Sequence, residues 1–577
     1  MNRRDLLKYM SLSGAAVALA GREPLAHSAA STQGKLALNE SGYLPESEKI
    51  ANVLMEDATD RSFQIYSEQA GRSVFRGQLT ASSIDAASGD QVALADFSQL
   101  TTPGTYRFVA QGIQSQQISI SNDVYFKVLV LSIRAFYGQR CGCSVDIGGG
   151  YRHAACHHSA AYHPSSGREA AAMNHGGWHD AGDYGRYMVN SAIATATLLW
   201  AWELYPRTLR ALSLRIPESG GKLPDYLAEI RWNLEWMLSL QDEDGGVWHK
   251  QTSEQFCGFI LPEDDHLTSY IIGTGAAPYK STCASAGMAA TMAIAARCYR
   301  TYDAAFSGRC LAAAKRGWNW AVAHPNVLFA NPPGIGTGSY TDSHCNHELL
   351  WTSAELWRTT GNRQYEQAFL DGCRALPPET AIAAPSWSNV APLAYWTYLL
   401  SERKGSDQLR SRARAQTEMV AQMLLTRQRS NGYGNTLGPE DYIWGSNSVA
   451  ANQSLLLLVA DHFRPDRRMK EAALGNLHYL LGRNCFGVSW VTHVGTNPFL
   501  HPHHRPSIAD NIAAPWPGLL SGGPNANPAD PVAKNLPKRP PMRMWLDDKM
   551  AYSLNEVAIN WNAPLVFLLA AANDRAL

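Results

Sequence analysis

The sequence lacks an excess of either charge and lacks a long apolar stretch. Lys plus Arg number 50 and Asp plus Glu number 50, which gives a formal net charge of zero. A nucleic-acid-binding protein normally shows a basic excess or stripe, so this balance argues against such a partner. No run reaches the ~20 uncharged apolar residues that a membrane-spanning helix needs. We therefore expect neither nucleic-acid binding nor a membrane span.

Cysteine is scattered rather than grouped. Most of the ten cysteines follow no recognisable spacing, and several lie in apolar helical patterns, where a buried free thiol is the ordinary case. A disulfide-stapled small fold is excluded, and so is disorder, because hydrophobic residues make up 45% of the chain and charged residues 17%. The length of 577 residues is enough for several domains, about four at ~150 residues each.

The first thirty residues have the features of an export signal. Arg3 and Arg4 precede an apolar run from Met10 to Ala20, and small residues suited to cleavage follow at 26–30. The run is too short to cross a membrane, and an arginine pair directly before it is typical of the twin-arginine route. We expect residues 1–30 to be a twin-arginine signal peptide and the mature protein to be periplasmic or secreted.

Residues 35–122 show short segments with alternating apolar and polar residues, separated by turn signals such as Pro103-Gly104. At least five such strands in under ninety residues predict a small all-β sandwich of immunoglobulin type. No charged or aromatic group within it suggests chemistry, so we interpret it as a packing or spacer module.

Residues 123–577 change to a helical period, with apolar residues at i, i+3, i+4 and i+7. Twelve helices taken as six hairpins predict an all-α (α/α)6 toroid, although a helical solenoid also fits the count. The loops at 141–183, 241–283, 325–345 and 484–550 are long enough to carry function. The expected helices are 124–140, 184–204, 221–240, 284–303, 304–324, 346–360, 361–374, 387–403, 406–429, 446–463, 467–482 and 551–573.

Two separate segments supply carboxylates. Asp180-Ala-Gly-Asp183 precedes a predicted helix, where either Asp could simply cap the helix. Glu556 falls in an otherwise apolar predicted helix, so burial should raise its pKa, as a general acid requires. Hydrolysis of a glycosidic bond needs two carboxyl groups, one on each side of the bond. A closed helical ring would bring these two ends of the chain together.

Three motifs in this order resemble the signatures of family 9 glycoside hydrolases of the cellulase type that carry an N-terminal immunoglobulin-like domain. The first is the Asp180–Asp183 segment. The second runs from Ser489 to Arg505 and contains Pro502-His503-His-Arg505, which alone would suggest a surface turn or an anion contact. The third runs from Trp545 to Ala563. The resemblance covers residues 35 to 573.

The resemblance implies an inverting hydrolase of β-1,4-glucosidic bonds. Asp183 would be the base that activates water, Asp180 would hold the same water, and Glu556 would be the acid. Base and acid would then stand ~6.5–9.5 Å apart. The other implied site residues are Asp547, which would orient the site, His503 and Arg505, which would bind sugar hydroxyls, and the substrate-binding residues His249, Trp444 and Tyr552.

A metal site is predicted beside the catalytic loop. Cys141, Cys156, His157 and His179 supply two thiolates and two imidazoles, a donor set that suits tetrahedral structural zinc. Relatives with the immunoglobulin-like domain hold zinc at the matching positions. The competing ligands are Cys143, His153 and His158, and a Cys141–Cys156 disulfide is an alternative in an exported protein.

Calcium is a further expectation, because relatives bind it through acidic loops. The candidate oxygens belong to Asp242, Glu243, Asp244, Glu263, Asp264 and Asp265, without a complete ligand shell, and solvated loop carboxylates are the ordinary interpretation.

The expected substrate is a β-glucan polysaccharide or oligosaccharide, cleaved by a monomeric endo-β-1,4-glucanase. Exo-acting hydrolysis of cello-oligosaccharides and exo-β-glucosaminidase action on chitosan oligosaccharides are alternatives within the resemblance. A catalytically inactive carbohydrate-binding protein is the alternative from another class, and the intact Asp180, Asp183 and Glu556 argue against it.

Overall fold

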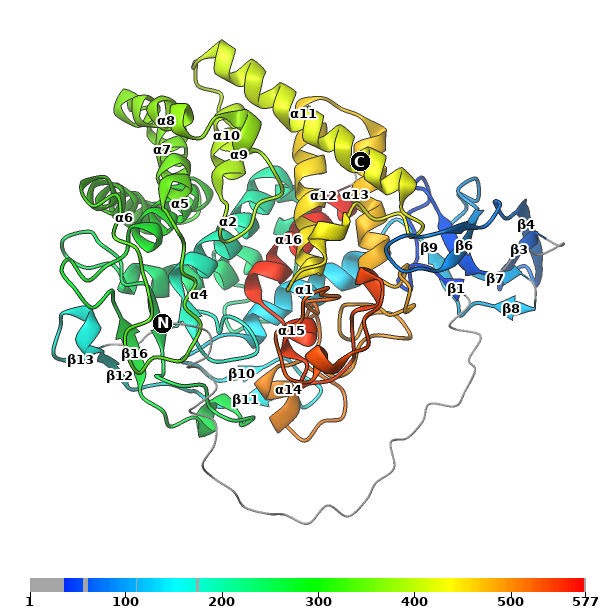
Figure 1. Ribbon diagram of the computed structural model, residues 1–577, viewed down its shortest axis with the longest axis horizontal. Helices are drawn as coiled ribbons and strands as arrows, with labels where there is room; N and C mark the ends of the chain where they lie inside the picture. The colour runs from blue at the N-terminus through cyan, green and yellow to red at the C-terminus, as the bar shows by residue number, and fades with distance from the viewer. Residues whose placement is uncertain (1–35, 56–60, 111, 173–175, 575–577) are drawn as a thin grey trace.

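The computed structural model describes residues 36–55, 61–110, 112–172 and 176–574. The predicted signal peptide at 1–30 lies outside these residues. Figure 1 shows a small β-structure at one side of the molecule and a larger helical body beside it. None of the helices in the described ranges is long and apolar enough to cross a membrane.

The N-terminal part is a two-sheet sandwich, as predicted. One sheet has the strand order β1-β2-β6-β5, and the other has the order β4-β3-β7-β8 with β9 also paired to β7. Alternate residues of β3 and β7, among them Phe63, Ile65 and Phe108, face a shared core. The strands are β1 Leu36–Ala37, β2 Ile50–Leu54, β3 Ser62–Ser67, β4 Arg72–Gln78, β5 Ser83–Ile84, β6 Gln91–Asp96, β7 Gly104–Ala110, β8 Ile113–Gln114 and β9 Ile118–Ile120.

The helical body is the predicted (α/α)6 toroid. Six helices that are buried on nearly all sides form the inner ring, because only the centre of the ring buries every face of a helix. Neighbours along the ring pack directly, as α2 does on α5, α5 on α7, α7 on α10, α12 on α16 and α16 on α2. The inner helices are α2 Met188–Leu204, α5 Thr282–Tyr299, α7 Asn346–Thr360, α10 Ala391–Leu400, α12 Ser446–Phe463 and α16 Ile559–Asn573.

Six further helices cover the ring from outside. Most are buried on one face only, and each packs on an inner helix. They are α1 Phe126–Gly138, α4 Asp225–Ser239, α6 Ala304–Ala323, α8 Arg363–Ala375, α11 Asp407–Ser430 and α13 Arg467–Leu480. Because outer and inner helices alternate along the chain, every long predicted loop leads into the N-terminal end of an inner helix. The loops therefore gather at one end of the ring.

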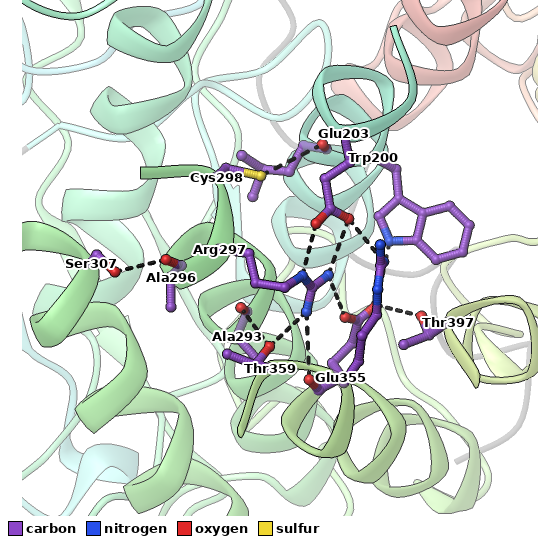
Figure 2. Close-up of polar contacts among 12 residues, drawn as sticks. Trp200, Glu203, Ala293, Ala296, Arg297, Cys298, Ser307, Glu355, Thr359 and Thr397 are labelled. Atoms are coloured by element: carbon purple, nitrogen blue, oxygen red, sulfur yellow. Dashed lines mark hydrogen bonds and ion pairs between the residues drawn. The ribbon is translucent and has the colours of Figure 1, made fainter. Parts of the chain in front are cut away.

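A buried polar cluster ties the inner helices together at their other end (Figure 2). Arg297 of α5 binds Glu203 of α2 and Glu355 of α7, with closest contacts of 2.8 Å to each. Glu355 also accepts a hydrogen bond from Trp200. Breaking such a buried ion pair typically costs about 3–5 kcal/mol, so the cluster fixes how these helices are positioned around the ring.

Short elements fill the loops. A five-stranded sheet with the order β13-β12-β16-β15-β14 lines the loop end of the ring, and β10 pairs with β11. Short helices lie in the connections. These elements are β10 Val145–Asp146, β11 Arg152–His153, β12 Ala160–Tyr162, β13 Ala171–Ala172, β14 Arg186–Tyr187, β15 Lys250–Thr252, β16 Ser269–Ile272, α3 Pro206–Arg210, α9 Pro378–Ala381, α14 Arg505–Ala509 and α15 Tyr552–Asn555.

Two sequence-based expectations need correction. The helix expected at 551–573 is broken, because α15 ends at Asn555 and α16 begins at Ile559, with Glu556 extended between them. The prediction of free thiols is wrong for Cys283 and Cys345. These two cysteines form a disulfide that joins the first turn of α5 to the residue before α7.

Candidate active site

The Asp180–Asp183 segment forms a tight turn that leads into β14 and α2. The turn is closed by the Asp180 amide, which donates to the Gly185 carbonyl at 2.9 Å. A Cβ atom added at Gly182 would lie 1.9 Å from the carbonyl oxygen of His503. Only glycine therefore allows the turn to pack against the segment that carries His503.

Backbone hydrogen bonds join this turn to two segments from the far end of the chain. The Arg505 amide donates to the Gly182 carbonyl at 3.1 Å, and the Ile559 amide donates to the Asp180 carbonyl at 2.9 Å. His503 and Glu556 form a parallel β-bridge, in which the His503 amide donates to Asn555. The two segments that carry Asp180, Asp183 and Glu556 are thus held together with the His503–Arg505 segment by main-chain contacts.

Asp180 is almost completely buried. Its two oxygens accept hydrogen bonds from Asn190 and from the Tyr340 hydroxyl, each at 2.6 Å. Burial and then the nearby charge of Asp183 raise the pKa of Asp180 to about 7. The two hydrogen bonds hold the Asp180 side chain in one orientation beside Asp183.

Asp183 is less enclosed than Asp180. Its Oδ2 accepts from the Gly185 amide at 2.9 Å and from the Tyr187 hydroxyl at 3.3 Å. The carboxylate lines a small cavity together with Tyr184, Phe256 and Arg505. These contacts fix Asp183 while one side of it faces the cavity.

Glu556 is partly exposed, and its position in the break between α15 and α16 is what frees its side chain. Burial raises the pKa of Glu556 well above the usual value, and the charges of Asp183 and Asp180 raise it further. Arg505 and a hydrogen bond from Trp444 act in the opposite direction. The net result is a carboxyl group that holds its proton to higher pH than an ordinary glutamate.

Three of the predicted site residues support the active-site segments. Nδ1 of His503 bonds the Lys549 carbonyl at 2.7 Å, and its ring packs against Phe259 and Tyr552. Arg505 donates all its described hydrogen bonds to the carbonyls of Gly182 and Cys257.

Asp547 accepts from the amides of Leu500 and His501 and from the side chain of Asn555, at 2.8–3.0 Å. It therefore positions the two strands of chain that meet at the His503–Glu556 bridge, in line with the orienting role implied by the resemblance.

The three predicted substrate-binding residues differ in exposure. Trp444 is 41% exposed and its ring lies 5.6 Å from that of Tyr552, so both can stack on a sugar. His249 is 1% exposed, with its ring nitrogens bonded to Ser281 and to the Ser339 carbonyl. This placement argues against direct contact between His249 and substrate, and it makes His249 a support for the segment that carries Tyr340.

Several residues that contact the carboxylates escaped the sequence analysis. They are Asn190 and Tyr340 at Asp180, and Tyr187 at Asp183. Lys250 is buried beside Tyr187, and burial lowers its pKa to about 7. Tyr187 and Asn190 follow Asp183 within seven residues, so their proximity was a usable signal. Tyr340 lies 160 residues from Asp180 along the chain, so no local sequence signal pointed to it.

The four predicted metal ligands come together. One donor atom from each of Cys141, Cys156, His157 and His179 lies within 4.8 Å of the others. Sγ of Cys141 is 3.6 Å from Nδ1 of His157, and Sγ of Cys156 is 3.9 Å from Nε2 of His179. A tetrahedral zinc with ~2.3 Å bonds to sulfur and ~2.0 Å to nitrogen requires donor atoms at about such separations.

The cluster ties the end of α1 to the catalytic turn. The Cys141 amide donates to Gly177 and the His179 amide donates to Gln139, so the two segments pair directly before Asp180. Nε2 of His157 lies 3.3 Å from Asp265, which gives one ligand an outer-sphere carboxylate. The Cys141 and Cys156 sulfurs are 4.0 Å apart and are not bonded, so the disulfide alternative is not what the structure shows.

The acidic residues considered for calcium do not form a common site in the described residues. Asp242 and Asp244 both pair with Lys280, and Asp265 pairs with His157. The charges of these three aspartates are thus met by side chains of the protein, and their oxygens give no support to a calcium site.

Comparison with known proteins agrees with this geometry. A family profile described as glycosyl hydrolase family 9 matches residues 125–569, and one described as cellulase N-terminal ig-like domain matches residues 31–115. The chain is 35% identical to endoglucanase D of Acetivibrio thermocellus over 545 residues, which span 93% of this chain and 83% of that protein.

Two further relatives are matched over nearly their whole lengths. A cellodextrinase of Butyrivibrio fibrisolvens is 34% identical over 555 residues, with 93% of this chain and 99% of that protein covered. The structure of a zinc-binding triple mutant of a family 9 endoglucanase superposes with a TM-score of 0.86 at 34% identity and covers 92% of this chain and 100% of that one.

Proposed function

Because this chain belongs to glycosyl hydrolase family 9, and is therefore a glycoside hydrolase of the cellulase type, we propose that it cleaves internal β-1,4-glucosidic bonds of soluble or amorphous β-glucans with inversion. The observation that carries this proposal is the main-chain contact between the Asp180–Asp183 turn, His503 and Glu556. It brings two aspartates and one glutamate close enough together at the loop end of the ring for the charges of Asp183 and Asp180 to raise the pKa of Glu556.

Asp183 is the base in this proposal. Its Oδ2 is held by Gly185 and Tyr187, so Oδ1 is left to take a proton from the attacking water. Asp180, fixed by Asn190 and Tyr340, positions the same water. An activated and oriented water is what an inverting displacement requires of this side of the sugar.

Glu556 is the acid. Its raised pKa keeps it protonated, so it can give a proton to the leaving glycosidic oxygen while Asp183 accepts one from water. The two transfers balance within one step, and no covalent intermediate forms on the protein.

Aromatic rings beside Glu556 offer a surface for the glucan chain. Trp444 and Phe256 are 41% and 48% exposed. Ring contacts join Trp444 to Tyr552, Tyr552 to His503 and His503 to Phe259. Flat apolar faces of glucose units stack on such rings. We propose that Trp444, Tyr552 and His503 bind substrate, whereas Arg505 and His249 position the segments around it.

The Cys141, Cys156, His157 and His179 cluster fits a structural zinc ion. Two thiolates and two imidazoles fill four positions and leave none for a substrate or a reactive water. When bound, the ion would supply cross-linking rather than chemistry, because it would fix residue 179 directly before Asp180. A zinc-binding triple mutant of a family 9 endoglucanase, which has the same fold, supports this assignment.

The export signal at residues 1–30 stays a prediction and implies a periplasmic or secreted enzyme. The relatives named endoglucanase support internal cleavage of the glucan chain, whereas the relative named cellodextrinase supports attack on short oligosaccharides. The two modes differ in how quickly viscosity falls for each reducing end released.

The substrate is tested by assays run side by side on carboxymethyl-cellulose, barley β-glucan, cello-oligosaccharides and chitosan oligosaccharides. Internal cleavage predicts a rapid fall in viscosity per reducing end, and NMR at short times should show the α-anomer first. Release of the β-anomer first would contradict inversion. Activity confined to chitosan oligosaccharides would contradict the glucan assignment.

The roles of the carboxylates are tested by Glu556→Gln and Asp183→Asn, with the exposed surface residue Glu169→Gln as the matched control. Loss of either group should lower the rate on cellopentaose by about 10²–10⁴-fold. An aryl cellobioside with a good leaving group should be hydrolysed much better by Glu556→Gln than by Asp183→Asn, because only the acid is dispensable there. Equal rescue of both variants would contradict the assignment.

A further inference from the structure

A second cluster of metal-binding side chains lies outside the site described above. Asp342, His344 and His347 each offer one ligand atom, and these atoms all lie within 4.8 Å of one another. The residues have the spacing Asp-x-His-x-x-His at the start of α7, so one short segment of chain delivers all three donors.

The polar atoms of this cluster are buried without hydrogen-bond partners among the described residues. These atoms are Oδ2 of Asp342 and Nδ1 of both His344 and His347, and His347 is only 6% exposed. An unsatisfied buried donor or acceptor destabilises a fold, and native proteins rarely keep several together. A single ligand between the three side chains would satisfy all of these atoms.

Glu348 adds a buried negative charge next to the cluster. It is 2% exposed, neither of its oxygens has a hydrogen-bond partner in the described part of the chain, and Oε2 lies 3.5 Å from Nδ1 of His347. When both are ionised, the carboxylates of Asp342 and Glu348 bring a charge of −2 to this group of partly and fully buried side chains. A divalent cation would neutralise that charge.

The fold holds the histidines close together. The Cys283–Cys345 disulfide anchors Cys345, one of the two residues between His344 and His347, to α5. The His344 and His347 rings have centroids 4.3 Å apart and are inclined at 67°. The cluster is thus cross-linked to an inner helix of the ring.

The donor types select the class of ion. Imidazole nitrogen combined with carboxylate oxygen suits zinc and its first-row neighbours, such as cobalt, nickel and copper. Calcium and magnesium prefer shells made of oxygen alone. We propose that Asp342, His344 and His347 form a second metal site that binds one divalent transition-metal ion, with Glu348 as a fourth or outer-sphere ligand.

One short segment of chain connects this site to the catalytic centre. Tyr340, whose hydroxyl bonds Asp180, precedes Asp342 by two residues in the same segment. An ion at the start of α7 would fix that segment and with it the orientation of Tyr340. The proposal itself concerns metal binding and does not depend on the hydrolase assignment.

The test uses the full-length enzyme, stripped of metal with a chelator and titrated anaerobically with Co²⁺ alone. Wild type should bind two equivalents. One equivalent should show the near-ultraviolet thiolate-to-cobalt absorption of the Cys141 cluster, and the other should add visible bands without it. The double variant His344→Gln/His347→Gln should lose only the second equivalent, and Cys156→Ser should lose the thiolate absorption and keep the other.

His462→Gln, an exposed histidine at the end of α12, is the matched control and should bind two equivalents. Equal melting temperatures of metal-free wild type and metal-free double variant would show that the loss is local. If the double variant does not fold, His344→Gln alone should weaken the second equivalent at least tenfold. A single equivalent in wild type, an unchanged stoichiometry in the variants, or displacement of the second cobalt by calcium rather than by zinc would overturn the proposal.

Discussion

The proposed chemistry depends on a carboxyl group that keeps its proton near two other carboxyl groups. Burial and the charges of Asp183 and Asp180 raise the pKa of Glu556, while Arg505 and the Trp444 indole lower it. An indole N–H can only donate, so its hydrogen bond stabilises the charged carboxylate. Trp444 is therefore both a stacking surface and an influence on the acid.

We expect Trp444→Phe to move the alkaline limb of the kcat/KM profile on cellopentaose to higher pH. The ring for stacking is kept, but the donor that favours ionised Glu556 is gone. The pKa of Glu556 then rises further, and the protonated, active form persists to higher pH. The measurement is kcat/KM against pH from acid to alkaline conditions.

Trp387→Phe serves as the control for this profile, because the Trp387 indole packs on Tyr340. Its alkaline limb should coincide with that of the wild type. An alkaline limb that is unmoved or shifted to lower pH in Trp444→Phe would mean that the limb does not report Glu556.

At the level of helices and loops, the periodic segments were predictable and the interruptions were not. Helices with a sustained 3.6-residue period appeared within a few residues of their predicted bounds, because amphipathic or uniformly apolar faces decide their burial. The break at Glu556 was missed, since it arises from pairing with His503, a contact that the local apolar pattern does not encode.

Of the two cross-links between distant positions, the metal cluster was predictable from the sequence and the disulfide was not. The Cys141, Cys156, His157 and His179 set was predictable because its residue types suit a single metal and all four residues lie in the 141–183 loop. The Cys283–Cys345 disulfide joins cysteines 62 residues apart in helical patterns that resemble those of ordinary buried thiols. Nothing in the local sequence distinguishes that pair from a free one.

Loss of the proposed zinc site should loosen the catalytic turn and also destabilise the fold. We expect Cys156→Ser to lower the melting temperature and to lower the rate by about 10²-fold, since a displacement of ~1 Å at a reacting group has about that effect. Elemental analysis should find one zinc fewer per chain than in wild type.

Cys310→Ser is the matched control, because this buried free thiol lies in α6 and is not a ligand of either metal cluster. It should keep the full zinc content and rate. Cys156→Ser with an unchanged melting temperature but lost activity would instead indicate a chemical role for the metal.

The sandwich and the helical toroid share an interface that the sequence did not suggest. Asn52 binds Arg483 and the Gly432 carbonyl, and Asp90 binds Arg543 and Tyr433. Arg483 directly precedes the 484–550 segment and Arg543 lies within it, and this segment carries His503. The domain interpreted as a packing or spacer module is thus a support for the active-site loop, as the side-by-side arrangement in Figure 1 allows.

Glu40 is the most direct test of that support. Its Oε2 accepts from the Thr496 and Asn497 amides at 2.7 Å each, a few residues before His503. Removing an acceptor that serves two backbone amides should cost about 1.5–3 kcal/mol. We expect Glu40→Ala to lower the melting temperature and also kcat on cellopentaose, although the substitution lies in the sandwich.

Glu40→Gln should recover much of both losses, because its amide oxygen can still accept from the two backbone donors. Arg76→Ala changes an exposed residue of β4, a strand that Figure 1 shows at the side of the sandwich away from the helical body, and should leave both quantities unchanged. Calorimetry of the wild type should show the two domains unfolding in one transition, because the interface couples them. Separate transitions, with Glu40→Ala affecting only the first and leaving the rate intact, would return the sandwich to the status of a spacer.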